Sequence, residues 1–124
     1  MNGIVFGIDE NGNYYSRSQF QKELNANENE MKIAEHFISV SGNKITLERR
    51  ADNYLSLCNG QDDLIRFKFT DRSKWISVDA WTSKLPENDI RFSAHKNKKQ
   101  RFWKADIRSL DDISMFDDIV ARLI

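Results

Sequence analysis

Residues 54–81 carry aromatic and cationic side chains at alternating positions. The segment YLSLCNGQDDLIRFKFTDRSKWISVDAW contains three short runs of period-two alternation separated by two turn signals. Successive side chains of a strand point to opposite faces, so one face is apolar. The other presents Tyr54, Arg66, Lys68 and Trp75. Rings and cations of this kind form cation–π contacts and anchor interfaces, so the pattern predicts a binding surface rather than a catalytic site.

The alternation also predicts how these strands pair. A loop over residues 59–63 places Leu57 opposite Ile65 on the apolar face. The next connection places Lys68 opposite Trp75 on the polar face, where cross-strand neighbours touch. The alternative is a tighter turn at Asn59-Gly60, which would place leucines opposite polar positions of the next strand. We therefore expect the longer loop.

A second aromatic and basic cluster lies in residues 91–104. The sequence RFSAHKNKKQRFWK contains six basic residues, and its flanks predict a hairpin of strands 90–95 and 102–107. Alternation directs Phe92 and Trp103 into the core of this hairpin. With the outward residues of both regions combined, the predicted binding residues are Tyr54, Arg66, Lys68, Trp75, Trp81, Arg91, Phe102 and Lys104.

Two kinds of partner fit this face. Tyrosine, tryptophan and arginine dominate protein interfaces, which favours a protein partner and a regulatory or inhibitory role. Cations for phosphates and rings for bases also suit single-stranded nucleic acid, bound across the same face and residues 91–104. The glycine–aromatic signature of sheet-based RNA binders is absent from the sequence. A third reading is that the N-terminal helix or hairpin covers the face and its rings belong to the core.

Motifs for catalysis or metal binding do not emerge from the sequence. His36 and His95 have no ligand at metal-site spacing, and the single cysteine, Cys58, has no histidine in an obvious partner position. Capping and solvation account for the aspartates of the C-terminal region, Asp111, Asp112, Asp117 and Asp118. We therefore expect a non-enzymatic protein without a cofactor or bound metal, and a metal-dependent enzyme ranks third among the hypotheses.

Composition predicts a single domain over residues 1–124. A hydrophobic content of 40% is enough for a core, and 19 acidic residues balance 19 basic ones, so net charge favours neither nucleic acid nor membrane. The basic excess is confined to residues 83–108, with eight bases and three acids. The sequence shows no apolar run of membrane-spanning length and no secretion signal, which predicts a cytoplasmic protein with no membrane partner.

The remaining patterns predict an α+β fold, with a mostly antiparallel sheet of about five to seven strands and an N-terminal and a C-terminal helix packed on it. Ser109 and Asp112 form a capping-box signal at the start of the last helix. The apolar stripe of that helix is Ile113, Phe116, Val120, Leu123 and Ile124. The other expected elements are a hairpin over residues 3–16, a helix over 18–37 with a break at 25–29, and a strand over 44–50.

Overall fold

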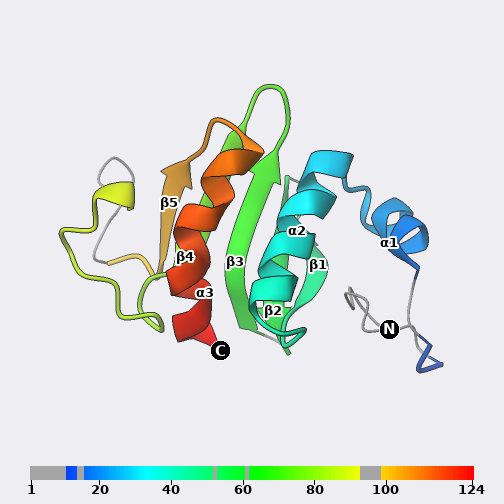
Figure 1. The fold of residues 1–124 in the computed structure, drawn as a ribbon, viewed down its shortest axis with the longest axis horizontal. Helices are drawn as coiled ribbons and strands as arrows, with labels where there is room; N and C mark the ends of the chain where they lie inside the picture. The colour runs from blue at the N-terminus through cyan, green and yellow to red at the C-terminus, as the bar shows by residue number, and fades with distance from the viewer. Residues whose placement is uncertain (1–10, 14–15, 52, 61, 93–98) are drawn as a thin grey trace.

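The structure is a computed structural model that describes residues 11–13, 16–51, 53–60, 62–92 and 99–124. Within this part, one five-stranded antiparallel sheet has its strands in sequence order, and α2 (Glu28–Val40) and α3 (Asp117–Leu123) cross the same face of it (Figure 1). The predicted α+β fold is confirmed. The strands are β1 (Thr46–Ala51), β2 (Tyr54–Asn59), β3 (Asp62–Phe69), β4 (Lys74–Asp79) and β5 (Phe102–Asp106).

The predicted N-terminal helix is two helices, α1 (Arg17–Leu24) and α2, with a break where it was expected. Asn25 ends α1 in the left-handed conformation at φ 52°, which asparagine tolerates better than most residues. Asn27 then caps α2 by accepting from the Glu30 N–H. Most of the predicted hairpin over 3–16 lies outside the described residues.

The central register is as the alternation predicted. Leu57 pairs with Ile65, and Lys68 pairs with Trp75. The expected long loop is wrong, because pairing continues to Asn59 and Asp62. The asparagine–glycine turn is not formed either, because Asn59 is itself paired. A bulge beyond Leu57 shifts the register by one residue, so the longer pairing and the correct apolar face coexist.

The predicted hairpin of residues 90–95 and 102–107 is wrong. β5 pairs with β4, with Val78 opposite Trp103, and residues Ile90–Phe92 form a 3₁₀ helix. Both pairings send Trp103 inward, so alternation alone could not distinguish them. Phe92 reaches the core as expected, and its ring lies 6.1 Å from that of Trp103. Residues 93–98 of the predicted hairpin lie outside the described part.

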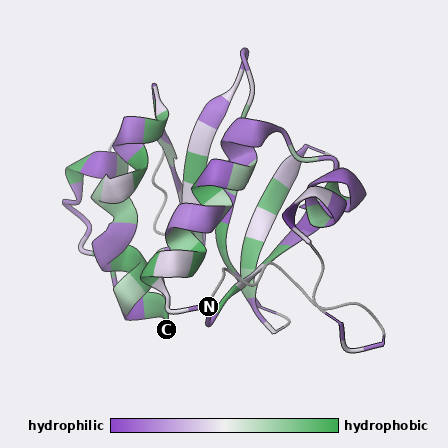
Figure 2. Ribbon diagram, turned by 45° about the vertical axis from the view of Figure 1, so that its right-hand side comes forward, coloured by the Kyte–Doolittle hydropathy of each residue, from purple (hydrophilic) through white to green (hydrophobic). Residues whose placement is uncertain are grey.

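The C-terminal region begins with a 3₁₀ helix, Leu110–Phe116, which continues into α3. The Ser109–Asp112 capping box is formed. Four of the five predicted stripe residues are buried, whereas Ile124 is exposed at the chain end. Apolar residues occur along both the helices and the strands (Figure 2). The core consists largely of their side chains, among them Met31, Phe37, Leu55, Phe67, Ile76, Phe116 and Ile119.

Candidate binding face of the sheet

We call the sheet face opposite α2 and α3 the outer face. Six of the eight predicted binding residues lie on it, and all six are partly exposed: Tyr54, Arg66, Lys68, Trp75, Phe102 and Lys104. α2 and α3 lie on the other face (Figure 1), and Phe20 of α1 belongs to the core there. The alternative reading in which the N-terminal helix covers these rings is therefore wrong, while most of the hairpin that could also cover them lies outside the described residues.

Arg66 is the centre of the outer face. Its guanidinium carbon lies 3.9 Å from the centroid of the Phe102 ring and 5.5 Å from that of Tyr54. Its Nε donates to Asp63 Oδ2 at 3.1 Å. A planar guanidinium stacks on rings and pairs with a carboxylate at the same time, which a lysine ammonium does less well. The two rings therefore flank a cation whose orientation is fixed.

Trp75 forms the second cluster of the outer face. Its ring lies 6.1 Å from that of Tyr54, and Lys104 Nζ lies 5.0 Å from the Trp75 ring centroid. Lys68 is its cross-strand neighbour on β3. The predicted row of Tyr54, Lys68 and Trp75 is present, with the addition that Lys104 of β5 supplies the cation nearest the indole.

Asp63 links three strands beneath Arg66. Its Oδ1 accepts from Arg50 Nε at 2.8 Å and from the Cys58 thiol at 3.4 Å. Burial by itself would raise the pKa of Asp63, but hydrogen bonds from Arg50, Cys58 and Arg66 outweigh it and lower that pKa. Asp63 is thus a carboxylate that positions Arg66. This role could not be predicted from the sequence, because the bulge decides where Asp63 points.

Asp79 plays a similar part at the end of β4. Its side chain is fully buried, with Oδ2 accepting from Arg101 Nη2 at 2.7 Å and Oδ1 accepting from the Thr82 N–H at 3.0 Å. Burial would raise the pKa of Asp79, and the bonds from Arg101 and Thr82 more than compensate and lower it. Neither Asp79 nor Arg101 was among the predicted residues. Alternation along β4 places Asp79 on the outer face, and this pattern could have been used to predict it.

Cys58 also points to the outer face but is buried. Burial raises the pKa of its thiol to about 12. A thiol of this kind is almost entirely protonated at neutral pH, and the thiolate is the nucleophilic form. A buried, protonated thiol is therefore a poor nucleophile.

Two predicted residues are not on the outer face. Arg91 lies in the 3₁₀ helix on the other side of the molecule, where it binds Asp89 at 2.6 Å and Asp118 at 2.7 Å. These carboxylates raise the pKa of Arg91 further above its usual range. Trp81 follows the end of β4 in a turn and is 55% exposed. β4 ends at Asp79, before it reaches Trp81. Arg91 lies in a 3₁₀ helix and not in the predicted strand, so strand alternation aligns neither side chain with the outer face.

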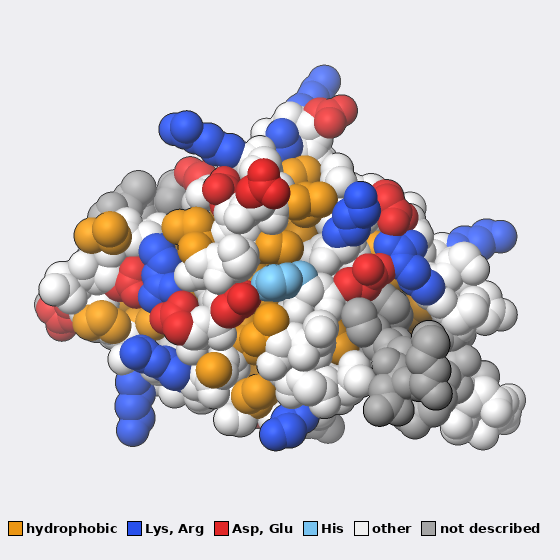
Figure 3. Space-filling view, in the orientation of Figure 1, with side chains coloured by type: hydrophobic (Ala, Val, Ile, Leu, Met, Phe, Trp, Pro, Cys, Tyr) orange, Lys and Arg blue, Asp and Glu red, His pale blue; other side chains and the backbone are white. Residues whose placement is uncertain are grey.

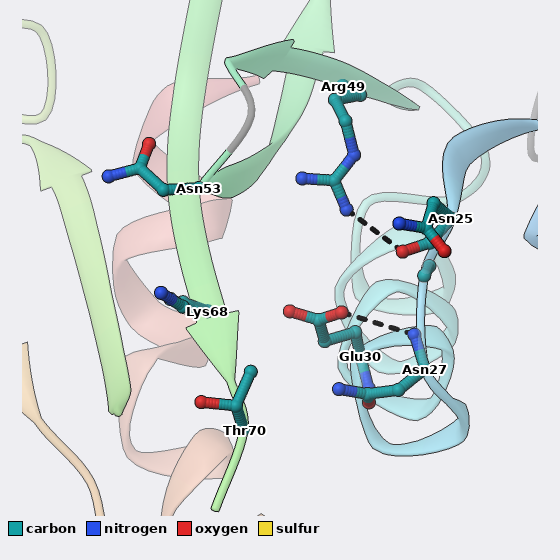
Figure 4. A pocket seen from close by; sticks show the side chains of 8 residues that line it. Asn25, Asn27, Glu30, Arg49, Asn53, Lys68 and Thr70 are labelled. Carbon is teal, nitrogen blue, oxygen red and sulfur yellow. Dashed lines mark hydrogen bonds between the residues drawn. The ribbon is translucent and has the colours of Figure 1, made fainter. Parts of the chain in front are cut away.

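A polar cleft opens where the α1–α2 connection meets the ends of β1 and β3 (Figure 4). Its charged side chains are Arg49, Glu30 and Lys68, the last of which also lies on the outer face, and the first two already have partners. Arg49 Nε donates to the Leu24 carbonyl at 2.6 Å and so binds the end of α1. Glu30 accepts from the Asn27 N–H at 3.1 Å and from the Phe69 N–H at 3.2 Å. These bonds hold the helices on the sheet, which gives both charges a structural role.

The helix-covered side presents acidic and basic side chains intermixed (Figure 3). There His36 Nε2 lies 2.6 Å from Asp117 Oδ1, linking α2 to α3, while His95 is outside the described residues. Asp112 caps the 3₁₀ helix. In the described part of the chain, no three histidine, cysteine or acidic side chains gather as metal ligands would.

Comparisons with protein families, with curated proteins and with solved structures find no match to this chain. Among the helices of the described residues, none has the length and apolar character needed to cross a bilayer. The candidate site therefore rests on the geometry of the outer face.

Proposed function

We propose that this protein is a non-enzymatic binding module that engages a protein partner through the outer face, in a regulatory or inhibitory role. The observation that carries the proposal is the stacking of Arg66 between Phe102 and Tyr54, 3.9 and 5.5 Å from their ring centroids. Arginine, tyrosine and tryptophan are the residues that contribute most to protein interfaces. Here they form one contiguous group on the sheet.

Preorganisation supports the same reading. Binding is costly when rotamer-rich side chains must be ordered, at about 0.5–1.5 kcal/mol each. Arg66 is already fixed by Asp63, and Arg101 is fixed by Asp79. Little side-chain entropy is therefore lost when a partner packs on Arg66 and Arg101.

The ion pairs of the outer-face arginines favour protein over nucleic acid, although Lys68 and Lys104 are not part of these pairs. Phosphate binding requires cations that are available to replace counterions. Three arginines of the outer face already pair with carboxylates within it, namely Arg50, Arg66 and Arg101. A mixed-charge, aromatic surface matches the polar and apolar mosaic of protein interfaces.

Photo-crosslinking tests the proposal. Tyr54 is replaced by p-benzoylphenylalanine, which keeps an aromatic ring there, and the protein is irradiated in an extract of its native cells. We expect a protein adduct that is lost when Trp75→Ala is added. The matched control carries the photoreactive residue at Ser39, an exposed position of α2 on the other face. Equal adducts from both positions, or none from position 54, would contradict the proposal.

Nucleic acid is tested in the same series. Anisotropy of a fluorescein-labelled oligothymidylate is measured at low salt, where phosphate contacts are strongest. We expect no binding that depends on Lys104. Binding that weakens steeply with salt and is reduced by Lys104→Ala would assign the outer face to single-stranded nucleic acid instead.

A further inference from the structure

We infer that the partner presents an acidic segment with an apolar side chain, and that this segment docks over Trp75 between Lys68 and Lys104. The inference rests on the proposed function and specifies the chemistry of the partner. It is motivated by the unequal distribution of charge along the outer face.

The Trp75 end of the outer face is basic. A depression beside Trp75 is lined by residues from the β3–β4 connection and from β5. Three cations lie near the indole or line this depression, against two carboxylates: Lys68, Arg72 and Lys104, against Asp71 and Asp106. Lys74 points to the helix-covered face, where its ammonium lies 5.3 Å from the centroid of the Phe69 ring. Within the described part of the chain, Lys68 and Lys104 form no ion pair. Their charges are therefore available to an incoming carboxylate.

The Phe102 end differs because its cations are paired with carboxylates of the same chain. The depression there is lined by Arg50, Asp62, Asp63, Arg66, Arg101 and Phe102. Its arginines pair within the face, Arg50 and Arg66 with Asp63, and Arg101 with Asp79. Carboxylates of a partner gain little at this end, because these three arginines are already paired and like charges lie nearby. Electrostatic complementarity thus orients the acidic segment towards Trp75.

The indole supplies the apolar part of the site. Lys104 Nζ lies 5.0 Å from the centroid of the Trp75 ring, so an acidic side chain that reaches this ammonium lies beside the indole. A neighbouring apolar side chain of the partner then covers the ring and excludes water, which strengthens the charge pair. Tyr54, with its ring 6.1 Å from that of Trp75, extends the apolar surface.

Selection from a random dodecapeptide phage library on the full-length immobilised protein tests the inference. We expect enrichment of peptides that combine aspartate or glutamate with an aromatic or leucine residue. The best synthetic peptide is then titrated calorimetrically. The double variant Lys68→Ala/Lys104→Ala should weaken binding roughly tenfold or more, and added salt should do the same. The control is Lys22→Ala/Lys32→Ala, which removes the same charge from exposed positions of α1 and α2.

Each result separates the inference from the proposed function. Peptides that need Trp75 but show no acidic enrichment, and bind the Lys68→Ala/Lys104→Ala variant unchanged, overturn the inference and leave the outer face as a binding site. Peptides that bind Trp75→Ala as tightly as the wild type count against both the inference and the proposed function. Displacement of an acidic peptide by an oligothymidylate at low salt assigns the same cations to nucleic acid and overturns the acidic-segment inference.

Discussion

Replacing Glu30 with alanine should destabilise the protein more than replacing any other glutamate of α1 or α2 with alanine. Phe69 is near the end of β3, and the register places Asn53 opposite it, outside β2. The backbone of Phe69 therefore has no strand partner on that side. Glu30 accepts from its N–H at 3.2 Å, and Asn27 Nδ2 donates to its carbonyl at 2.6 Å. Side chains at the start of α2 thus take the place of a missing strand residue.

The magnitude follows from the two bonds that Glu30 makes. Loss of the acceptor leaves the buried Phe69 N–H unsatisfied, which costs about 1–3 kcal/mol. Loss of the capping-box bond to the Asn27 N–H costs about 0.5–1 kcal/mol, because water replaces it in part. Glu30→Ala should therefore lower the free energy of unfolding by about 1.5–4 kcal/mol, a large part of the 5–15 kcal/mol typical of a domain. Glu30→Gln keeps one acceptor oxygen and should cost about half as much.

Urea denaturation of the three variants Glu30→Ala, Glu30→Gln and Glu23→Ala measures this order. Glu23 is exposed on α1, so its replacement should change stability by less than about 0.5 kcal/mol. Hydrogen exchange of the Phe69 amide gives a site-specific readout, since its protection should fall in Glu30→Ala beyond the loss of global stability. Wild-type stability in Glu30→Ala, or unchanged Phe69 protection, would refute the assignment of Glu30 as a substitute strand partner.

Three further outcomes are expected. The pKa values of Asp63 and Asp79 are lowered in the folded protein, so both carboxylates contribute their full stabilisation above about pH 5 and lose it as pH falls through the folded-state pKa. The variant Asp63→Asn should therefore show a smaller loss of stability with acid than the wild type. An unchanged dependence of stability on pH would contradict this. Arg66→Lys should weaken partner binding while costing less than about 1.5 kcal/mol of stability, measured by urea titration, because an ammonium stacks poorly on Phe102. Cys58 should react with a thiol reagent at neutral pH only at the rate of unfolding, and rapid labelling of the native protein would show that the thiol is accessible.

The outer face shows where sequence reasoning succeeds. Lys68 and Trp75 lie opposite each other because the side-chain period of a strand is two and the connection between β3 and β4 is short. The break at Asn25 and the cap at Ser109 were also readable, since both depend on the conformational preferences of residues within one turn.

Other features required the tertiary structure. Alternation predicts which face Trp103 occupies but not which strand β5 pairs with. Pairing with β4 buries the Trp103 indole, and the predicted hairpin would have buried it to the same degree. The stacking of Arg66 on Phe102 depends on this pairing, because it brings β5 next to β4 and within reach of β3. Sequence determined the sides of the strands through local geometry. Only the packed sheet decided which side chains meet, because contacts between distant segments depend on how all the strands share one core.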